Sequence, residues 1–329
     1  MLAFVKAPRF LYVANQASDN LSIFRILPGG ALHPHATVST GTGSGPRGLV
    51  TDRLSRYLYV SNVTNNTIHH YAIDPLSGSL TLRSTLASGN YPIRLTLEPG
   101  GSFILAPNNS GTTVSSYEIH SGTGALTDRG ASATGCASDP QDVRVDASRR
   151  FAYIACQASN TVSVRSFDAT TGNLGAITTI AGSGSIGIAT DPAGRLLYTA
   201  AYGGSSLESF TVNASNGTLS GPSTVGAGTN PQSVVLHPAG GFAYVTNYTS
   251  SNISHYALDA STSMPSFIQN VSSGTNPMML TIDPLGQFAY TANFTGNSIS
   301  MYAIVSGQLV SQGSIQAGSG PRSVLAVSF

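Results

Sequence analysis

A small set of arginines, glutamines and one aspartate could do chemistry in this sequence. Each stands within four residues after a proline, at Arg47, Arg94, Gln141, Asp142, Arg144, Gln232 and Arg322. Guanidinium groups donate paired hydrogen bonds to carboxylates and phosphates. A carboxylate in a partly desolvated site can act as a general base toward water. If the fold gathers these side chains, we expect them to bind a small anionic or lactone ligand, with Asp142 as the base.

A sevenfold repeat would position these residues. The segment FLYVANQASDNLSIFRI begins at residue 10, and related segments begin at 57, 103, 151, 196, 242 and 288. The intervals are 47, 46, 48, 45, 46 and 46 residues. So regular a period indicates a repeat architecture, and it overrides the two domains that a length of 329 residues alone would suggest. We therefore expect one domain over residues 1–329.

Each repeat divides into four short β-rich runs. In the second repeat they are GLVTD (48–52), YLYVSN (57–62), TIHHYAI (67–73) and SLTLRSTLA (79–87). Runs of this kind, bounded by Gly, Pro, Asn and Asp, indicate antiparallel strands. The sequence therefore predicts an all-β, seven-bladed β-propeller of four-stranded blades. The proline phrase opens the first run, so the polar residues above would lie on the innermost strands, facing a central funnel.

The C-terminal segment GSGPRSVLAVSF matches the phrase that opens each repeat, but no second run follows it. We expect residues 323–328 to form the innermost strand of the first blade and to close the ring, which removes two exposed sheet edges. Residues 2–5, LAFV, are the alternative strand for that place.

Several polar groups also have structural explanations. Arg94 and Asp142 could form an ion pair between blades without a catalytic role. His70 and His255 occupy a position that is apolar in several repeats, which predicts packing between blades with one hydrogen bond each. Eight of the 14 carboxylates stand at turns, where they would cap backbone amides, at Asp52, Asp74, Glu98, Asp146, Asp168, Asp191, Asp259 and Asp283.

Composition limits the classes of partner. The net charge is +1, charged residues make up 9% of the chain, and Lys6 is the one lysine. No basic stripe is present to neutralise phosphates, so we expect no nucleic-acid partner. No apolar run is long enough to span a bilayer, and MLAFVKAP is too short for a signal peptide. The Lys-poor surface, rich in Ser, Thr and Asn, favours an extracytoplasmic (periplasmic or secreted) protein, which we expect to be a monomer.

The two cysteines leave two interpretations open. Pairing residue 146 with 151 across a turn places Cys156 opposite Gln141, five residues from Cys136. A disulfide is then geometrically reasonable and would fit an oxidising compartment. Two separate small apolar residues are the alternative.

Metal and cofactor sites lack support in the sequence. No His/Cys cluster has zinc-like spacing, and no DxDxDG calcium loop is present. We therefore expect no metal and no cofactor. A single calcium or sodium ion held by backbone carbonyls in the channel is left open.

Phrases along the whole chain resemble the seven-bladed propeller lactonase family. They are DPLSGSLT (74–81), HSGTGALT (120–127), DATTGNLG (168–175), NASNGTLS (213–220), PQSVVLHPAGGFAYVTN (231–247) and PMMLTIDPLGQFAYTAN (277–293). The likeness extends to the Tyr-Val-Thr-Asn (YVTN) repeat propellers of cell surfaces, whose tetrapeptide stands at 244–247. The resemblance implies an enzyme similar to 6-phosphogluconolactonase or the fungal carboxymuconate cyclase, with histidine, arginine and carboxylate groups in the funnel.

The resemblance also implies a histidine near the proline that precedes an innermost strand. The second residue after that proline, or its equivalent, is not a histidine in any repeat, but Gly48, Arg94, Asp142, Gly187, Ser233, Met279 or Ser323.

Two classes of function follow. The first is hydrolysis of a small lactone or sugar-acid lactone, with Asp142 as base and Arg47, Arg94, Arg322, Gln141, Arg144 and Gln232 binding the substrate. The second is a non-catalytic extracytoplasmic binding or scaffold propeller, which displays loops on a rigid ring to a protein partner.

Overall fold

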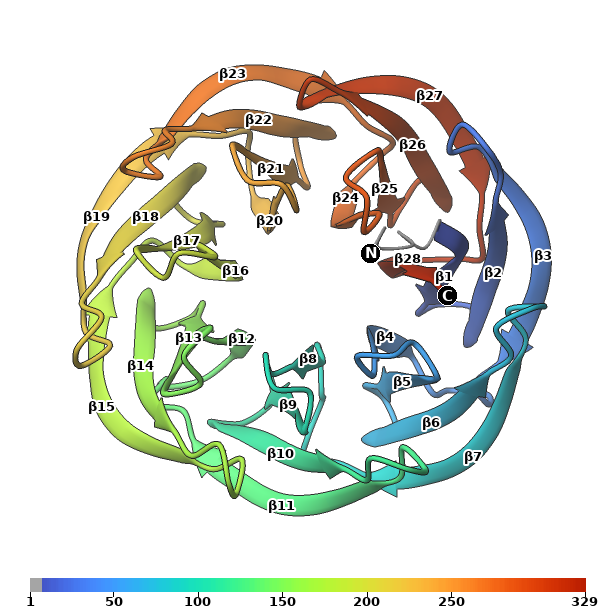
Figure 1. Cartoon of the computed structure of the whole chain (residues 1–329), viewed down its shortest axis with the longest axis horizontal. Helices are drawn as coiled ribbons and strands as arrows, with labels where there is room; N and C mark the ends of the chain where they lie inside the picture. The colour runs from blue at the N-terminus through green and yellow to red at the C-terminus, as the bar shows by residue number, and fades with distance from the viewer. Residues whose placement is uncertain (1–7) are drawn as a thin grey trace, which may run out of the picture.

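A computed structural model describes residues 8–329, and these form seven four-stranded antiparallel sheets arranged as the blades of a ring (Figure 1). The seven-bladed β-propeller predicted from the repeat is confirmed. The innermost strands are β28 (Pro321–Ser328), β4 (Pro46–Thr51), β8 (Thr96–Leu97), β12 (Pro140–Val145), β16 (Ser185–Thr190), β20 (Pro231–Leu236) and β24 (Pro277–Ile282), for blades one to seven.

The other three strands of each blade follow outward in chain order. The second strands are β1 (Pro8–Asn15), β5 (Tyr57–Asn62), β9 (Phe103–Asn108), β13 (Phe151–Cys156), β17 (Leu196–Ala201), β21 (Phe242–Asn247) and β25 (Phe288–Asn293). The third strands are β2 (Asn20–Ile26), β6 (Thr67–Ile73), β10 (Thr113–Ile119), β14 (Thr161–Phe167), β18 (Ser206–Val212), β22 (Asn252–Leu258) and β26 (Ser298–Val305). The outermost strands are β3 (Leu32–Ser39), β7 (Leu80–Ala87), β11 (Leu126–Ala133), β15 (Leu174–Ala181), β19 (Leu219–Gly226), β23 (Pro265–Ser272) and β27 (Gln308–Gln316).

The C-terminal strand closes the ring. β28 pairs antiparallel with β1, and the first sheet has the order β28-β1-β2-β3. The predicted innermost strand at 323–328 is confirmed, and it begins two residues earlier, at Pro321. The alternative, residues 2–5, lies outside the described residues.

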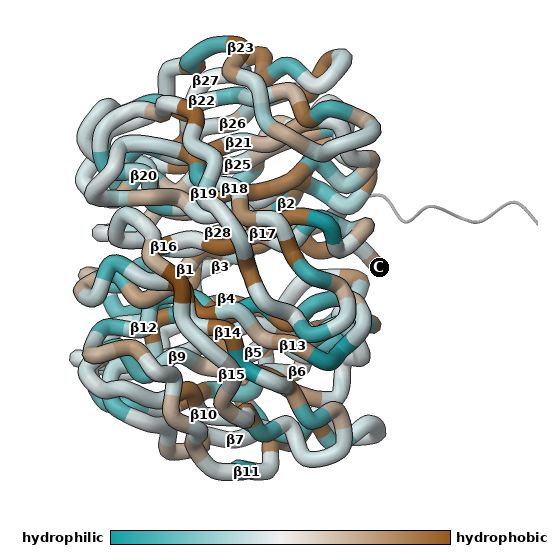
Figure 2. Tube along the Cα trace, turned by 90° about the vertical axis from the view of Figure 1, so that its left-hand side faces the viewer, coloured by the Kyte–Doolittle hydropathy of each residue, from teal (hydrophilic) through white to brown (hydrophobic). Residues whose placement is uncertain are grey.

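Buried tyrosines of the second strands join neighbouring blades. Tyr12 Oη donates to the carbonyl of Gly78 at 2.9 Å, Tyr59 to Gly124 at 2.7 Å and Tyr290 to Gly30 at 2.8 Å. Each acceptor lies in a turn of the next blade, before its outermost strand. Each phenol thus adds an inter-blade hydrogen bond to the apolar area that it buries. Figure 2 shows hydrophobic segments interspersed along the strands between the two loop faces.

The histidines at the apolar position are packing residues, as predicted. His70 stacks on Tyr59 with ring centroids 5.3 Å apart, and His255 stacks on Tyr244 at 5.0 Å. His70 Nδ1 forms the expected hydrogen bond, with Ser84 Oγ at 3.3 Å. The expectation of one hydrogen bond is wrong for His255, because neither ring nitrogen has a partner among the described residues.

The eight turn carboxylates also behave as predicted. In each turn the carboxylate accepts backbone N–H groups within the next five residues, at Asp52, Asp74, Glu98, Asp146, Asp168, Asp191, Asp259 and Asp283.

Cys136 and Cys156 form a disulfide with Cα atoms 5.3 Å apart. The register prediction behind it is wrong by one residue. Pro140, rather than Gln141, lies opposite Cys156, because a β-bulge interrupts the pairing between Pro140 and Asp142. Within residues 8–329, no helix has the length and apolar character that crossing a membrane requires.

Candidate functional site

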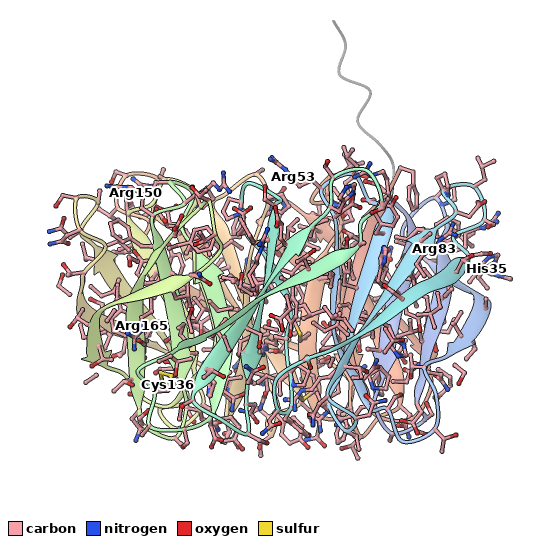
Figure 3. The ribbon with its side chains drawn as sticks, turned by 90° about the horizontal axis from the view of Figure 1, so that it is seen from below. His35, Arg53, Arg83, Cys136, Arg150 and Arg165 are labelled. Atoms are coloured by element: carbon pink, nitrogen blue, oxygen red, sulfur yellow. A yellow bond between two sulfur atoms is a disulfide. The ribbon has the colours of Figure 1, made fainter. Side chains whose placement is uncertain are left out.

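The innermost strands all begin at the same end of the central channel, because every blade repeats the same course. Figure 3 separates the two faces of the ring: Cys136, in the connection that leads into β12, lies toward one face, whereas Arg53 and Arg150, in turns between first and second strands, lie at the opposite face. We call the end of the channel on the Cys136 side the mouth.

An ion cluster of the buried Arg94 and Asp142 and the partly exposed Arg144 lies just inside the mouth. Arg94 Nη1 is 2.8 Å from Asp142 Oδ2, and Arg144 Nη2 is 3.3 Å from the same oxygen. The ion pair predicted as the structural alternative is therefore confirmed. Burial lowers the pKa of Arg94, and the charge of Asp142 opposes this shift by favouring the protonated guanidinium.

The cluster ties four blades together. Arg94 Nη2 donates across the channel to the carbonyl of Gln232 in β20 at 3.0 Å. Arg144 Nη1 donates to Thr96 Oγ1 in β8 at 2.6 Å, and its Nε donates to the carbonyl of Ile188 in β16 at 3.1 Å. Because the two arginines form hydrogen bonds to blades three, five and six, the cluster can hold the blades together and close the channel at this level.

Both oxygens of Asp142 are already used. The Val143 N–H donates to Oδ1 at 2.9 Å, and the Ile188 N–H donates to Oδ2 at 3.2 Å in addition to the two guanidiniums. The side chain has no exposed surface. Asp142 and Arg94 line a cavity of about 20 Å³ together with Gly48, Leu49, Leu95, Arg144, Met279 and Ser323. That volume holds about one water and excludes a sugar ring.

Arg47 and Arg322, one strand position nearer the mouth, carry uncompensated charge. Among residues 8–329, no carboxylate oxygen forms an ion pair with either guanidinium, whereas Arg94 and Arg144 share Asp142. Burial, then the charges of Arg322 and Arg94, lower the pKa of Arg47 to about 9, which leaves it cationic at neutral pH. Burial also lowers the pKa of Arg322. An anion bound between them would relieve this repulsion.

Aromatic and amide groups hold the two free arginines. The guanidinium of Arg322 lies 3.8 Å from the ring centroid of Phe294, and that of Arg47 lies 5.8 Å from the ring of Tyr91. Arg322 Nε donates to Gln16 Oε1 at 2.6 Å, and Gln16 Nε2 forms a long hydrogen bond with Tyr91 Oη at 3.5 Å. We call Gln16, Arg47, Tyr91, Phe294 and Arg322 the mouth cluster.

The two predicted glutamines have other partners. The Gln141 amide donates to the side chain of Gln157 in the same blade. Gln232 contributes its backbone carbonyl to Arg94. The structure thus divides the seven predicted residues into a group around Asp142, a mouth pair, Arg47 and Arg322, and Gln141, which stands at the corresponding position of β12 and bonds within its own blade.

The family model for the seven-bladed β-propeller lactonases matches residues 2–93, 49–139, 97–184 and 205–324. The chain belongs to this lactonase family. Its curated relatives include the 6-phosphogluconolactonases of Serratia proteamaculans, 25% identical over 175 residues, and of Pectobacterium carotovorum, 26% identical over 151 residues. The matches cover 50% and 44% of this chain and 52% and 45% of those proteins, so the chain spans about half the length of the curated relatives it matches.

Solved structures share the fold of this lactonase-family propeller. The periplasmic gluconolactonase of Pseudomonas aeruginosa superposes with a TM-score of 0.87 at 19% identity, covering 98% of this chain and 99% of that one. A protein from Lactobacillus plantarum gives a TM-score of 0.84 at 16% identity, covering 98% and 100%. At these identities the likeness concerns architecture.

Sequence reasoning did not identify Gln16, Tyr91 and Phe294 of this lactonase-family propeller as site residues. Gln16 and Phe294 each directly follow the second strand of a blade, and Tyr91 directly precedes a proline. Both are fixed positions in the repeat, so comparing them across the seven repeats could have shown a ring of varied side chains at the mouth.

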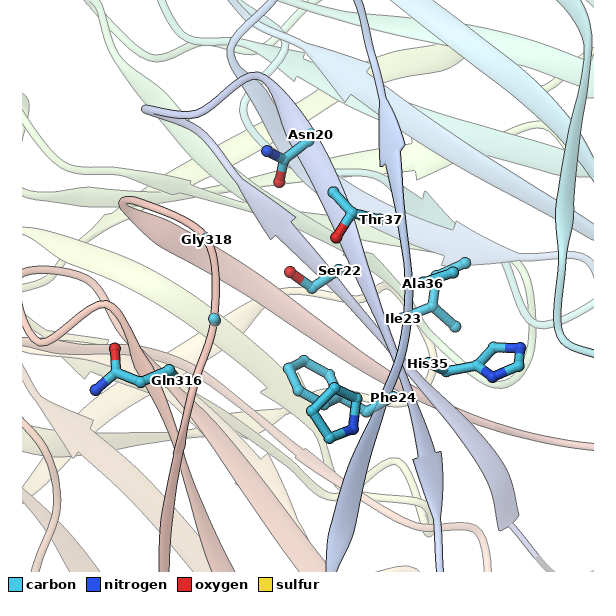
Figure 4. A pocket seen from close by; sticks show the side chains of 11 residues that line it. Asn20, Ser22, Ile23, Phe24, His35, Ala36, Thr37, Gln316 and Gly318 are labelled. Carbon is cyan, nitrogen blue, oxygen red and sulfur yellow. The ribbon is translucent and has the colours of Figure 1, made fainter.

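Other concave regions of this lactonase-family propeller lie away from the mouth. A groove of about 430 Å³ runs between blades one and seven, at the perimeter of the ring (Figure 4). Phe24, Pro34, Thr37 and Gln316 are among its lining residues, and none of these is charged. The part of the chain that the structure describes has no cluster of three or more His, Cys, Asp or Glu side chains placed to hold a metal ion.

Proposed function

We propose that this propeller binds a small anionic lactone or sugar-acid lactone at the channel mouth and hydrolyses it. The observation that carries the proposal is the pair of half-buried guanidiniums, Arg47 and Arg322, which have no carboxylate partner among the described residues. The charge of Arg322 also lowers the pKa of Arg47. Membership of the lactonase family and the 6-phosphogluconolactonases among its relatives support a lactone as the ligand.

Arg47 and Arg322 would bind the anionic substituent through the edges of their guanidiniums. Phe294 and Tyr91 cover one face of each guanidinium, which leaves N–H groups at the edges for a phosphate or carboxylate. The aromatic rings would also provide an apolar wall for the sugar ring. Of the other residues predicted to bind substrate, Gln141 would act at the level of the mouth arginines, and Arg144 and Gln232 would act at the channel below.

The reaction is addition of water to the lactone carbonyl carbon. The ring C–O bond then breaks, the proton from water ends on the ring oxygen, and a hydroxy acid results. The cavity that Asp142 and Arg94 line is one residue deeper than the mouth arginines, a rise of about 3.3 Å along a strand. A water there would be the attacking group, and Asp142, which stays the predicted base, would take its proton after giving up one of its present hydrogen bonds.

Asp142→Asn tests that role. If Asp142 is the base, the variant should keep its affinity for 6-phosphogluconate, the hydroxy-acid product, and lose turnover of 6-phosphogluconolactone by about 100-fold or more. Unchanged turnover would remove Asp142 from the chemistry and leave it as the partner that holds Arg94 across the channel. Thermal unfolding of the same variant reports that structural contribution separately.

We also propose an extracytoplasmic location and a monomeric state. The Cys136–Cys156 disulfide supports an oxidising compartment, because such bonds are rare in reducing ones. Thiol labelling of the protein recovered from separate cell fractions tests the location, and light scattering tests the monomer.

The relationship to the Tyr-Val-Thr-Asn surface propellers rests on the tetrapeptide at 244–247. Absence of turnover and of small-ligand binding would favour the scaffold role.

A further inference from the structure

One residue at the entry to each innermost strand adopts a left-handed backbone conformation in every blade; it stands directly before the proline or, in blade five, before Ser185. The same hydrogen bond identifies this residue in six blades, because its carbonyl accepts the N–H of the residue that follows the second strand. The six acceptors are Gly320, Gly45, Tyr91, Gly184, Asn230 and Asn276. In the remaining blade the residue is Asp139, and all seven have φ between 51° and 68°.

One of the seven breaks the chemical rule for this conformation. Gly, Asn and Asp tolerate positive φ, because they have no side chain or a short polar one. They occupy the position in six blades. Tyr91, with φ of 57°, is the exception, and a bulky aromatic residue is a true outlier there. A tyrosine at this position therefore makes the folded protein less stable than Asn or Gly would.

Neighbouring groups hold the backbone of Tyr91 in this conformation. Its N–H donates to Asn66 Oδ1 at 2.7 Å, and its carbonyl accepts the Asn109 N–H at 3.0 Å. The phenol of Tyr91 is then directed into the mouth cluster. Residues kept in sparsely populated backbone regions concentrate at functional sites, where the surrounding structure imposes them.

The phenol links the two free arginines. Arg322 Nε donates to Gln16 Oε1 at 2.6 Å, Gln16 Nε2 meets Tyr91 Oη at 3.5 Å, and the Tyr91 ring faces the Arg47 guanidinium at 5.8 Å. This chain crosses from blade one to blade three and back to blade two.

We propose that Tyr91 is a positioning residue, which sets the separation and orientation of Arg47 and Arg322 for the anionic group of the ligand. This inference rests on the proposed function. It adds that specificity for an anionic substrate depends on Tyr91, and that the strained backbone of Tyr91 is the cost of placing its side chain between the two arginines.

The test uses 6-phosphogluconate as the probe, with affinity from titration calorimetry and stability from thermal unfolding. Tyr91→Asn installs the residue that the same position has in blades six and seven. We expect it to raise the melting temperature by about 2 °C and to weaken binding about tenfold. Tyr91→Phe keeps the ring beside Arg47 and the strain but loses the link to Gln16, so we expect binding about threefold weaker and no gain in stability.

Asn230→Gly, at the same position in blade six, is the matched control. It changes the turn residue without touching the mouth cluster, and its affinity should equal that of the parent protein. If the parent binds the probe and Tyr91→Asn binds it equally well, Tyr91 is not a positioning residue, and the proposed function stands without it. If the parent neither binds the probe nor hydrolyses the lactone, the proposed function fails and the inference fails with it.

Discussion

Arg94 Nη1 and Asp142 Oδ2 lie 2.8 Å apart at the centre of the propeller, and these side chains are 9% and 0% exposed. The pair joins the segment directly before β8 in blade three to β12 of blade four, and Arg94 extends to blade six through Gln232. Breaking a charge pair this deeply buried is costly, because the remaining member is left with less compensation for its charge in a dry interior.

Arg94→Ala should lower the free energy of unfolding by about 3–5 kcal/mol, because the buried Asp142 then keeps Arg144 as its ion-pair partner but loses the closer guanidinium of Arg94. Chemical denaturation with guanidinium chloride measures the loss. Affinity for 6-phosphogluconate should stay within about twofold of the parent, since residues within direct reach of the anion are kept. A variant that unfolds like the parent but has lost binding would place Arg94 in the ligand site instead.

Arg47→Gln should have the opposite pattern. Arg322 and Arg94 repel the Arg47 charge, and no carboxylate among the described residues compensates it, so its removal should leave the melting temperature unchanged or raised. Binding of 6-phosphogluconate should weaken about tenfold or more, and the salt dependence of the remaining affinity should become shallower. Arg53→Gln, on the opposite face, serves as the control for the loss of one positive charge (Figure 3). Equal affinities for parent and Arg47→Gln would contradict the anion site.

Removing the disulfide should cost about 3 kcal/mol, because Cys136 and Cys156 are 20 residues apart in sequence and their bond restricts the unfolded chain. Cys136→Ser/Cys156→Ser and the reduced parent should unfold at the same, lower denaturant concentration. Their ligand affinity should match that of the oxidised parent. If the double variant is as stable as the oxidised protein, the bond contributes nothing to the fold.

Acid should destabilise the protein through its buried histidines. Burial lowers the pKa of His69, His70 and His255 below the ordinary value of 6.5. The unfolded chain therefore takes up protons first as the pH falls, so stability is full above about pH 7 and declines through pH 6.5 toward the lower pKa of each folded group. Melting temperatures between pH 8 and pH 5 measure the slope.

His255→Phe is the variant for this test, since a phenyl ring can keep the stack on Tyr244 and does not titrate. Its melting temperature should fall less steeply between pH 7 and pH 5 than that of the parent. A parallel decline in the two proteins would show that His255 takes no part in the acid response.

The repeat made most of the fold predictable from sequence. Its period gave seven blades, and the unpaired phrase at the C-terminus gave the strand that closes the ring on β1. The disulfide was foreseeable as one of two options. The register beside Cys156 was not, because counting back from the turn assumes a regular ladder, and a bulge at Gln141 interrupts it.

The site was less predictable. Arg47 and Arg94 stand one and two residues after their prolines, and this single step decides between a free guanidinium at the mouth and a buried ion pair. Sequence places both on innermost strands, but the partner of each depends on side chains that reach across blades. For the same reason the roles of Gln16 and Phe294 were missed, since Gln16 contacts Arg322 from the opposite end of the chain and Phe294 contacts it from the neighbouring blade.

The most direct test of the central claim is the initial rate of acid release from 6-phosphogluconolactone and from gluconolactone, followed by pH-stat with the parent protein and with Arg47→Gln. We predict that the parent hydrolyses the phosphorylated lactone well above its spontaneous rate. Arg47→Gln should lose most of that activity while changing hydrolysis of the neutral lactone less. Hydrolysis of both lactones by the parent at no more than the spontaneous rate would contradict the account of this propeller as a lactone hydrolase.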